Sequence, residues 1–155
     1  YYYVMKKYLF LLSAMCALTF IGCSDDSETE KALVGNWLLT AEWDGWVNPD
    51  TGKEEGELDP YTYDEAFILI LDKDGMATCY WDTSDPNDVD SAPYSYDSST
   101  NTIYLPILYD SDRVIIESLT DDQLILKCKY STSIGDSAEG FEDVTIVEKQ
   151  FFSRM

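Results

Sequence analysis

The sequence predicts an all-β protein, a single antiparallel barrel of eight strands. After residue 33, apolar side chains recur at every second position in several short segments, and Gly, Pro, Asn and Asp separate these segments. None of the segments has apolar residues at helical spacing. Short strands joined by turns are typical of a barrel or of a two-sheet sandwich, and the sandwich is the alternative.

The first predicted strand runs from Leu33 to Trp43. Trp37, Leu39, Ala41 and Trp43 alternate with other residues, so we expect these four side chains to share one face. Three acidic segments that contain Gly or Pro predict long loops at 44–60, 82–93 and 131–143. The other seven strands are predicted at 61–72, 76–81, 94–97, 103–108, 113–119, 124–130 and 144–154.

The N-terminal segment predicts a secretory signal peptide. Lys6 and Lys7 follow Met5, and residues 8–21 carry no charge. A basic start, a short apolar stretch and a small residue before the cut are the features of such a signal. The stretch is shorter than the roughly 20 residues that a membrane-spanning helix needs. We expect residues 1–22, upstream residues plus signal, to be removed.

A cysteine stands where this apolar segment gives way to acidic residues. The letters FIGC, ending at Cys23, resemble a bacterial lipobox, in which the cysteine becomes the lipidated first residue. This resemblance implies that Cys23 carries acyl chains such as palmitate and anchors the protein in outer-membrane lipid. Residues 23–32 would form an acidic tether, and they resemble the signal that directs Bacteroidota lipoproteins to the cell surface.

Composition excludes several classes of function. Without residues 1–22, the chain has 133 residues and a formal charge of −22, since that segment holds two of the ten basic residues and none of the thirty acidic ones. Residues 33–155 suffice for one domain. So negative a surface repels nucleic acid, whose binding relies on Lys and Arg. The absence of histidine removes His-dependent catalysis and the usual zinc and copper sites. We expect no cofactor.

Four short motifs resemble the bacterial lipocalin-like domain: GNW at Gly35–Trp37, LILDKDG at 69–75, IIESLTDDQLIL at 115–126 and FSR at 152–154. In lipocalins this Trp closes one end of the barrel beneath a basic residue from the chain end. The resemblance therefore implies a cation–π contact between Arg154 and Trp37. It also implies a strand order in which Cys79 and Cys128 are not neighbours, so we expect two thiols. The chain lacks the long helix of ligand-carrying lipocalins, which favours a smaller barrel.

An eight-stranded barrel is either filled by side chains or hollow enough for one small ligand. The inward candidates are bulky, which favours a filled core: Trp37, Leu39, Trp43, Phe67, Leu69, Leu71, Ile103, Leu105, Leu124 and Leu126. If the barrel binds a ligand, we expect Trp43 and Trp46 at its mouth and Phe67 and Leu69 within it.

Acidic residues suggest two further chemistries. The loop with Asp82, Asp85, Asn87, Asp88 and Asp90 offers oxygen ligands for calcium, but its spacing does not match an EF-hand, and we predict no metal site. A glycosidase needs two carboxylates at a fixed separation. Glu65 is the best candidate, and nothing marks a partner, so we expect no enzyme.

The leading hypothesis is therefore a surface-exposed outer-membrane lipoprotein that binds a small apolar molecule or a glycan in its barrel. The alternative is a filled barrel that contacts a protein partner of the cell envelope through its acidic loops. A carboxylate-dependent hydrolase is the third hypothesis.

Overall fold

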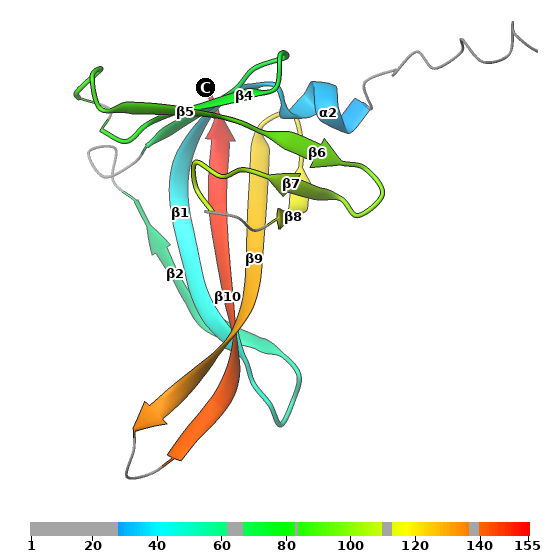
Figure 1. The fold of residues 1–155 in the computed structure, drawn as a ribbon, viewed down its shortest axis with the longest axis vertical. Coiled ribbons are helices and arrows are strands. Elements are labelled where there is room, and N and C mark those ends of the chain that lie inside the picture. Colours follow the sequence, from blue (N-terminus) through cyan, green and yellow to red (C-terminus); the bar gives the residue numbers. More distant parts are fainter. Residues whose placement is uncertain (1–27, 62–66, 83, 110–112, 137–139) are drawn as a thin grey trace, which may run out of the picture.

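The computed structural model describes residues 28–61, 67–82, 84–109, 113–136 and 140–155, and its fold is all-β as predicted (Figure 1). One short helix precedes the strands. The elements are α2 (Glu28–Leu33), β1 (Gly35–Val47), β2 (Glu54–Pro60), β3 (Ile68–Leu71), β4 (Met76–Tyr80), β5 (Val89–Pro93), β6 (Ser95–Asp97), β7 (Thr102–Tyr104), β8 (Arg113–Leu119), β9 (Gln123–Asp136) and β10 (Gly140–Arg154).

The strands form one antiparallel sheet that curls into a nearly closed barrel. Its order is β5-β4-β3-β1-β10-β9-β8-β7-β6, and β2 pairs with β1 outside this path. The two end strands, β5 and β6, are separated in the chain by Tyr94 alone. The Tyr94 backbone N–H donates to the Gly75 carbonyl, and its hydroxyl donates to the Asp72 carbonyl. A continuous path of this kind argues against the two-sheet sandwich.

The predicted number of eight strands is wrong, since the described residues form ten. Strand β5 lies in residues 82–93, which were predicted as a loop, whereas β6 falls within the strand predicted at 94–97. Strand β2 lies in another predicted loop, 44–60. Its acidic residues have low β propensity, but pairing with seven residues of β1 satisfies one edge of its backbone.

The last two strands are longer than predicted. Residues 131–143 were predicted as a loop, yet β9 reaches Asp136 and β10 begins at Gly140, and the two remain paired down to Asp136 and Gly140. Together with β2 and the second half of β1, this hairpin extends well below the other strands (Figure 1). We call this part the projecting sheet: residues 41–47, 54–60, 127–136 and 140–151.

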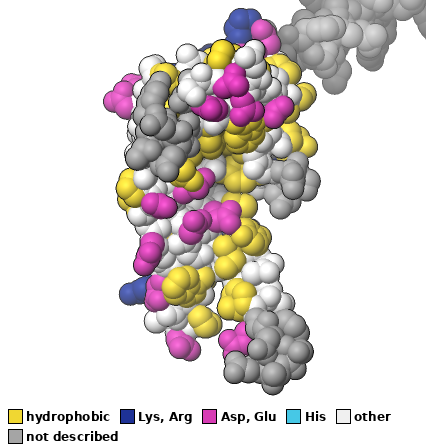
Figure 2. Space-filling view, turned by 90° about the vertical axis from the view of Figure 1, so that its left-hand side faces the viewer, with side chains coloured by type: hydrophobic (Ala, Val, Ile, Leu, Met, Phe, Trp, Pro, Cys, Tyr) yellow, Lys and Arg dark blue, Asp and Glu magenta, His cyan; other side chains and the backbone are white. Residues whose placement is uncertain are grey.

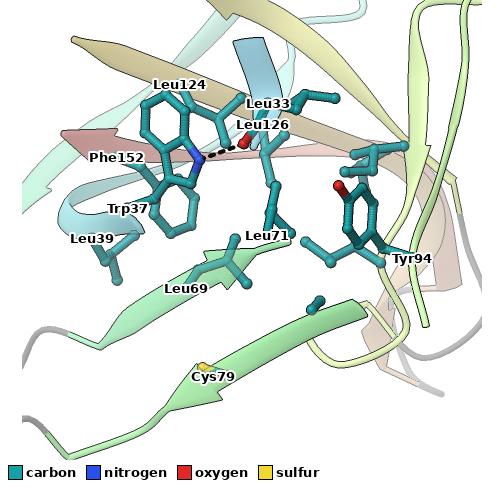
Figure 3. Close-up of a cluster of buried hydrophobic side chains, with 14 of the residues drawn as sticks. Leu33, Trp37, Leu39, Leu69, Leu71, Cys79, Tyr94, Leu124, Leu126 and Phe152 are labelled. Carbon is teal, nitrogen blue, oxygen red and sulfur yellow. Dashed lines mark hydrogen bonds between the residues drawn. The ribbon is translucent and has the colours of Figure 1, made fainter. Parts of the chain in front are cut away.

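Apolar side chains fill the barrel. Nine of the ten inward candidates are buried, and Trp43 is the exception. The core cluster also recruits Leu33 from α2, which is fully buried at one end of the barrel (Figure 3). Its largest fully buried side chains are Trp37, Phe152, Leu33, Leu39, Leu69, Leu71, Ile103, Leu105, Leu124 and Leu126.

Trp37 and Arg154 close the end of the barrel beside α2. The indole N–H of Trp37 donates to the Leu33 carbonyl at 2.8 Å (Figure 3). The Arg154 guanidinium carbon lies 4.3 Å from the Trp37 ring centroid, which confirms the predicted cation–π contact. Two guanidinium nitrogens of Arg154 donate to the carbonyls of Ala32 and Val34. A side chain at Gly35 would collide with this guanidinium, which explains the glycine.

A β-bulge in β1 reverses the two faces of the strand. Leu39 pairs with Phe152, but Ala41 pairs with Phe151, so Thr40 is an extra residue. The Thr40 hydroxyl donates to the Phe151 carbonyl at 3.0 Å. Phe151 and Phe152 are consecutive residues of β10 and point to opposite faces. Their partners Ala41 and Leu39 therefore point to opposite faces as well. The predicted shared face is therefore wrong beyond Leu39.

We predict that Arg154→Ala lowers the free energy of unfolding by about 2–4 kcal/mol, because the cation–π contact and two charged hydrogen bonds are lost. Arg154→Lys should lose less, since it keeps the charge but not the two-pronged donor. Urea unfolding measures both. The control Arg113→Ala removes an exposed arginine from β8. A loss at Arg154 no larger than at Arg113 would show that the barrel end does not depend on this contact.

Candidate functional site

The bulge gives the projecting sheet an inner face, continuous with the barrel core, and an outer face. Residues paired across an antiparallel sheet share a face. On the inner face, Glu42 lies beside Gln150, Asp44 beside Glu148, and Trp46 beside Ile146. On the outer face, Trp43 lies beside Lys149 and Gly45 beside Val147. The two faces differ in chemistry and are described in turn.

A polar network closes the lower end of the core. The Tyr61 hydroxyl donates to Glu42 Oε2 at 2.6 Å, and the Gln150 side-chain N–H donates to Glu42 Oε1 at 2.7 Å. The Tyr109 hydroxyl donates to Gln150 Oε1 at 2.6 Å. The bond to Glu42 raises the pKa of Tyr61 to about 12, and burial raises the pKa of Tyr109. Both oxygens of Glu42 therefore serve the structure.

A pocket of about 230 Å³ lies beneath this network. It is lined by Glu42, Asp44, Tyr109, Glu148, Lys149 and Gln150. The pKa of Asp44 is raised, first by partial burial and then by the negative charges of Glu42 and Glu148. Glu148 accepts a hydrogen bond from the Tyr130 hydroxyl at 2.6 Å, which raises the pKa of Tyr130 to about 12. Polar groups thus dominate the pocket.

Exposed apolar side chains follow directly below the pocket. Trp46 on β1 pairs with Ile146 on β10, which pairs with Tyr130 on β9. Trp46 is 46% exposed and Tyr130 is 41% exposed. Ile134, further along the same face of β9, is 53% exposed. Such a row of large apolar groups on a sheet surface is typical of a contact surface.

The outer face holds Trp43 over two glycines. Side chains at Gly45 or Gly56 would collide with the Trp43 ring, so both glycines make room for the indole. The Lys149 ammonium lies 5.2 Å from the centroid of that ring. Leu58, the partner of Trp43 on β2, is 57% exposed.

Three lysines converge on Glu54 at the same face. The Glu54 carboxylate lies 2.6 Å from the Lys127 ammonium, 2.8 Å from that of Lys129 and 3.2 Å from that of Lys149. Glu117 forms a second bridge to Lys127 and Lys149. The lysines lower the pKa of Glu54 from 4.5 to about 2. The cluster holds the first residue of β2 against β9 and β10.

We predict that Glu54→Gln lowers the melting temperature at pH 7, because it removes the carboxylate that separates three like charges. A lowered pKa means that this stabilisation is present above about pH 4.5 and is lost as the pH falls toward 2. The difference between the variant and the native chain should therefore shrink over that range. The control Glu57→Gln removes an exposed carboxylate of β2. A pH-independent difference would contradict the role of Glu54.

The structure does not bring the four predicted ligand residues together. Phe67 and Leu69 lie in the core, where Leu69 is fully buried and Phe67 packs against Trp81 and Phe152. Trp43 and Trp46 project from opposite faces of β1 because they are three residues apart. Of the four, Trp46 alone lies on the inner face with an exposed ring.

The other predicted residues have varied outcomes. Gly35, Trp37 and Arg154 form one structural unit, as described above. Cys79 and Cys128 do not form a disulfide, as expected, since β4 and β9 are not neighbours. Cys23 and Glu65 lie outside the described residues. The second half of the predicted tether forms α2.

The acidic loop at 82–90, which was considered and not predicted as a calcium site, uses its oxygens locally. Asp82 accepts hydrogen bonds from the backbone and hydroxyl of Ser84, and Asp85 accepts two from Asn87. Asp90 accepts the Trp81 indole N–H. In the described part of the chain, no group of three acidic or cysteine side chains is arranged to hold a metal ion.

Sequence reasoning missed the residues around the pocket: Glu42, Asp44, Tyr61, Tyr109, Glu148, Gln150 and Tyr130. They come from five separate segments, and the only available signal was Glu42 and Asp44 at alternate positions before Trp46. That signal was hidden because residues from 44 onward were read as a loop.

Comparison of the chain with protein-family models, curated proteins and solved structures found no match. Within the residues described, no helix combines the length and the apolar character needed to cross a membrane.

Proposed function

We propose that this chain is a non-catalytic interaction module of the bacterial cell envelope. In this proposal, acylated Cys23 anchors it as an outer-membrane lipoprotein at the cell surface, and a small lipocalin-like barrel presents the projecting sheet to a protein partner. One observation carries the choice of partner: large side chains fill the barrel, whereas exposed apolar groups gather on the projecting sheet.

The packed core favours this function over transport of a small apolar molecule. The bulky inward candidates other than Trp43 pack against one another in the barrel core. The pocket below them is lined by three carboxylates, a lysine, an amide and a tyrosine, which suit polar groups. A non-catalytic role is also consistent with Glu42, whose two oxygens accept hydrogen bonds from Tyr61 and Gln150.

The anchor is tested by Cys23→Ala. Without an acylated cysteine, the protein has no lipid to hold it, so we expect it to move from the membrane fraction to the soluble fraction of cells. Cys79→Ala is the matched control, because it removes a buried core cysteine and leaves the lipobox intact. Retention of the Cys23→Ala chain in membranes would contradict lipid anchoring.

The absence of a ligand cavity in the barrel is tested with N-phenyl-1-naphthylamine, a neutral dye that fluoresces in apolar cavities. Because the barrel is packed, we expect no saturable one-to-one binding to the native chain. Trp46→Ala serves as the control for attachment to the projecting sheet, where the ring is exposed. Stoichiometric binding that survives Trp46→Ala would indicate a ligand cavity and would overturn the proposal.

A further inference from the structure

We propose that the inner face of the projecting sheet docks an extended polypeptide segment in which Lys or Arg alternates with apolar residues. This inference rests on the proposed function and names the chemistry of the partner. Figure 2 shows exposed hydrophobic side chains in the lower half of the molecule, interspersed with acidic ones.

The apolar part of the docking surface is the row formed by Trp46, Ile146 and Tyr130. These three residues lie side by side across β1, β10 and β9, and two of them are more than 40% exposed. Val144 and the exposed Ile134 continue the face toward the end of the hairpin. Tyr and Trp give large contact area at low entropic cost and are typical anchors of protein interfaces.

The charges of the two faces are separated. Among the side chains that the structure describes in the projecting sheet, the strand register places seven carboxylates and no Lys or Arg on the inner face: Glu42, Asp44, Glu55, Glu57, Asp59, Glu142 and Glu148. The three lysines of these strands lie on the outer face, bound to Glu54 and Glu117. The inner face therefore complements a cationic partner and repels an anionic one.

The pocket above the apolar row suits the cationic group. Glu42, Asp44 and Glu148 line it together with Lys149, whose ammonium is bound to Glu54 and Glu117 on the outer face. The three carboxylates repel one another, and after burial this repulsion is the second cause of the raised pKa of Asp44. An ammonium or guanidinium group placed among them would remove it. Asp44 and Trp46 are two residues apart, about 7 Å along a strand. A cation in the pocket and an apolar side chain on Trp46 therefore match alternate or neighbouring side chains of one extended segment.

The edge of β9 favours an extended segment over a helix. Strand β8 pairs with β9 from Leu124 to Lys127, and in the described strands nothing pairs with the same edge from residue 129 to 134. The other edge, β2, carries four carboxylates and Pro60, residues that hinder strand addition. Residues 129–134 contain no acid and no proline. Main-chain pairing along this edge would place alternate side chains of the segment on the inner face beside Tyr130, and the rest of the segment would cross β10 to reach Trp46 and Asp44 on β1.

The test uses the full chain in detergent and a synthetic peptide of about ten residues in which Lys alternates with Leu and Thr. Affinity is measured by fluorescence anisotropy at 150 mM salt, which screens attraction by distant charges. A peptide with Glu in place of Lys is the first control. We expect saturable binding of the Lys peptide and no detectable binding of the Glu peptide.

Two pairs of variants locate the contact. Trp46→Ala should weaken the binding of the Lys peptide at least tenfold, whereas Leu58→Ala, which truncates an exposed side chain of the outer face, should change it less than twofold. Asp44→Lys should weaken it at least tenfold, whereas Asp121→Lys, with the same charge change in the turn before β9, should have a small effect. Thermal unfolding confirms that all four variants fold.

Three outcomes would overturn the inference. In the first, the Lys peptide binds no more tightly than the Glu peptide. In the second, each inner-face variant behaves like its control, which indicates diffuse charge attraction. In the third, Trp46→Ala lowers association with phosphatidylcholine vesicles rather than with the peptide, which assigns the face to a membrane. Each of these leaves the dye experiment unaffected, so failure of this inference and failure of the proposed function are distinguishable.

Discussion

The single extra residue at Thr40 decides what each face of the projecting sheet presents. Before the bulge, Trp37 and Leu39 point into the core, and after it Glu42, Asp44 and Trp46 take the inner side. Without the bulge, Glu42, Asp44 and Trp46 would exchange faces with Ala41, Trp43 and Gly45. The Trp43 indole would then face the interior, and the carboxylates would lie on the same side as the lysines. Register changes of one residue exchange whole faces in this way.

Closure at one end and a polar network at the other leave the barrel itself little room for a ligand. At the upper end, Trp37 lies between the Leu33 carbonyl and the Arg154 guanidinium. At the lower end, the hydrogen bonds among Tyr61, Glu42, Gln150 and Tyr109 satisfy polar groups beneath the apolar core. The barrel thus acts as a rigid support for the strands that extend beyond it.

The projecting sheet keeps opposite charges on opposite faces, and the two faces differ in how well those charges are compensated. On the outer face, each lysine has a carboxylate partner, and the pKa of Glu54 is lowered. On the inner face, the pKa of Asp44 is raised, first by partial burial and then by the like charges of Glu42 and Glu148. Crowded carboxylates cost stability in the isolated chain, and a cationic partner would relieve that cost. This arrangement is characteristic of binding surfaces.

Local patterns predicted much of the barrel. Leu69, Leu71, Leu124 and Leu126 were among the predicted inward residues, the last two from alternation, and all four are fully buried or nearly so. Residues 113–119 were predicted as a strand and form β8 with the same bounds. Residues 44–60 and 131–143 were wrongly predicted as loops, because their acidic residues have low β propensity. There, pairing with neighbouring strands outweighs the preference of single residues.

The sequence by itself determined the all-β class, the alternation that fills the core, and the end of the barrel that Gly35, Trp37 and Arg154 build. The tertiary structure alone decided that Trp43 and Trp46 serve different faces and that Glu42, Asp44 and Glu148 share a pocket. Alternation is a property of neighbouring residues and can be read along one strand. A bulge depends on the register with another strand, and Thr40 meets Phe151 across 111 residues of chain.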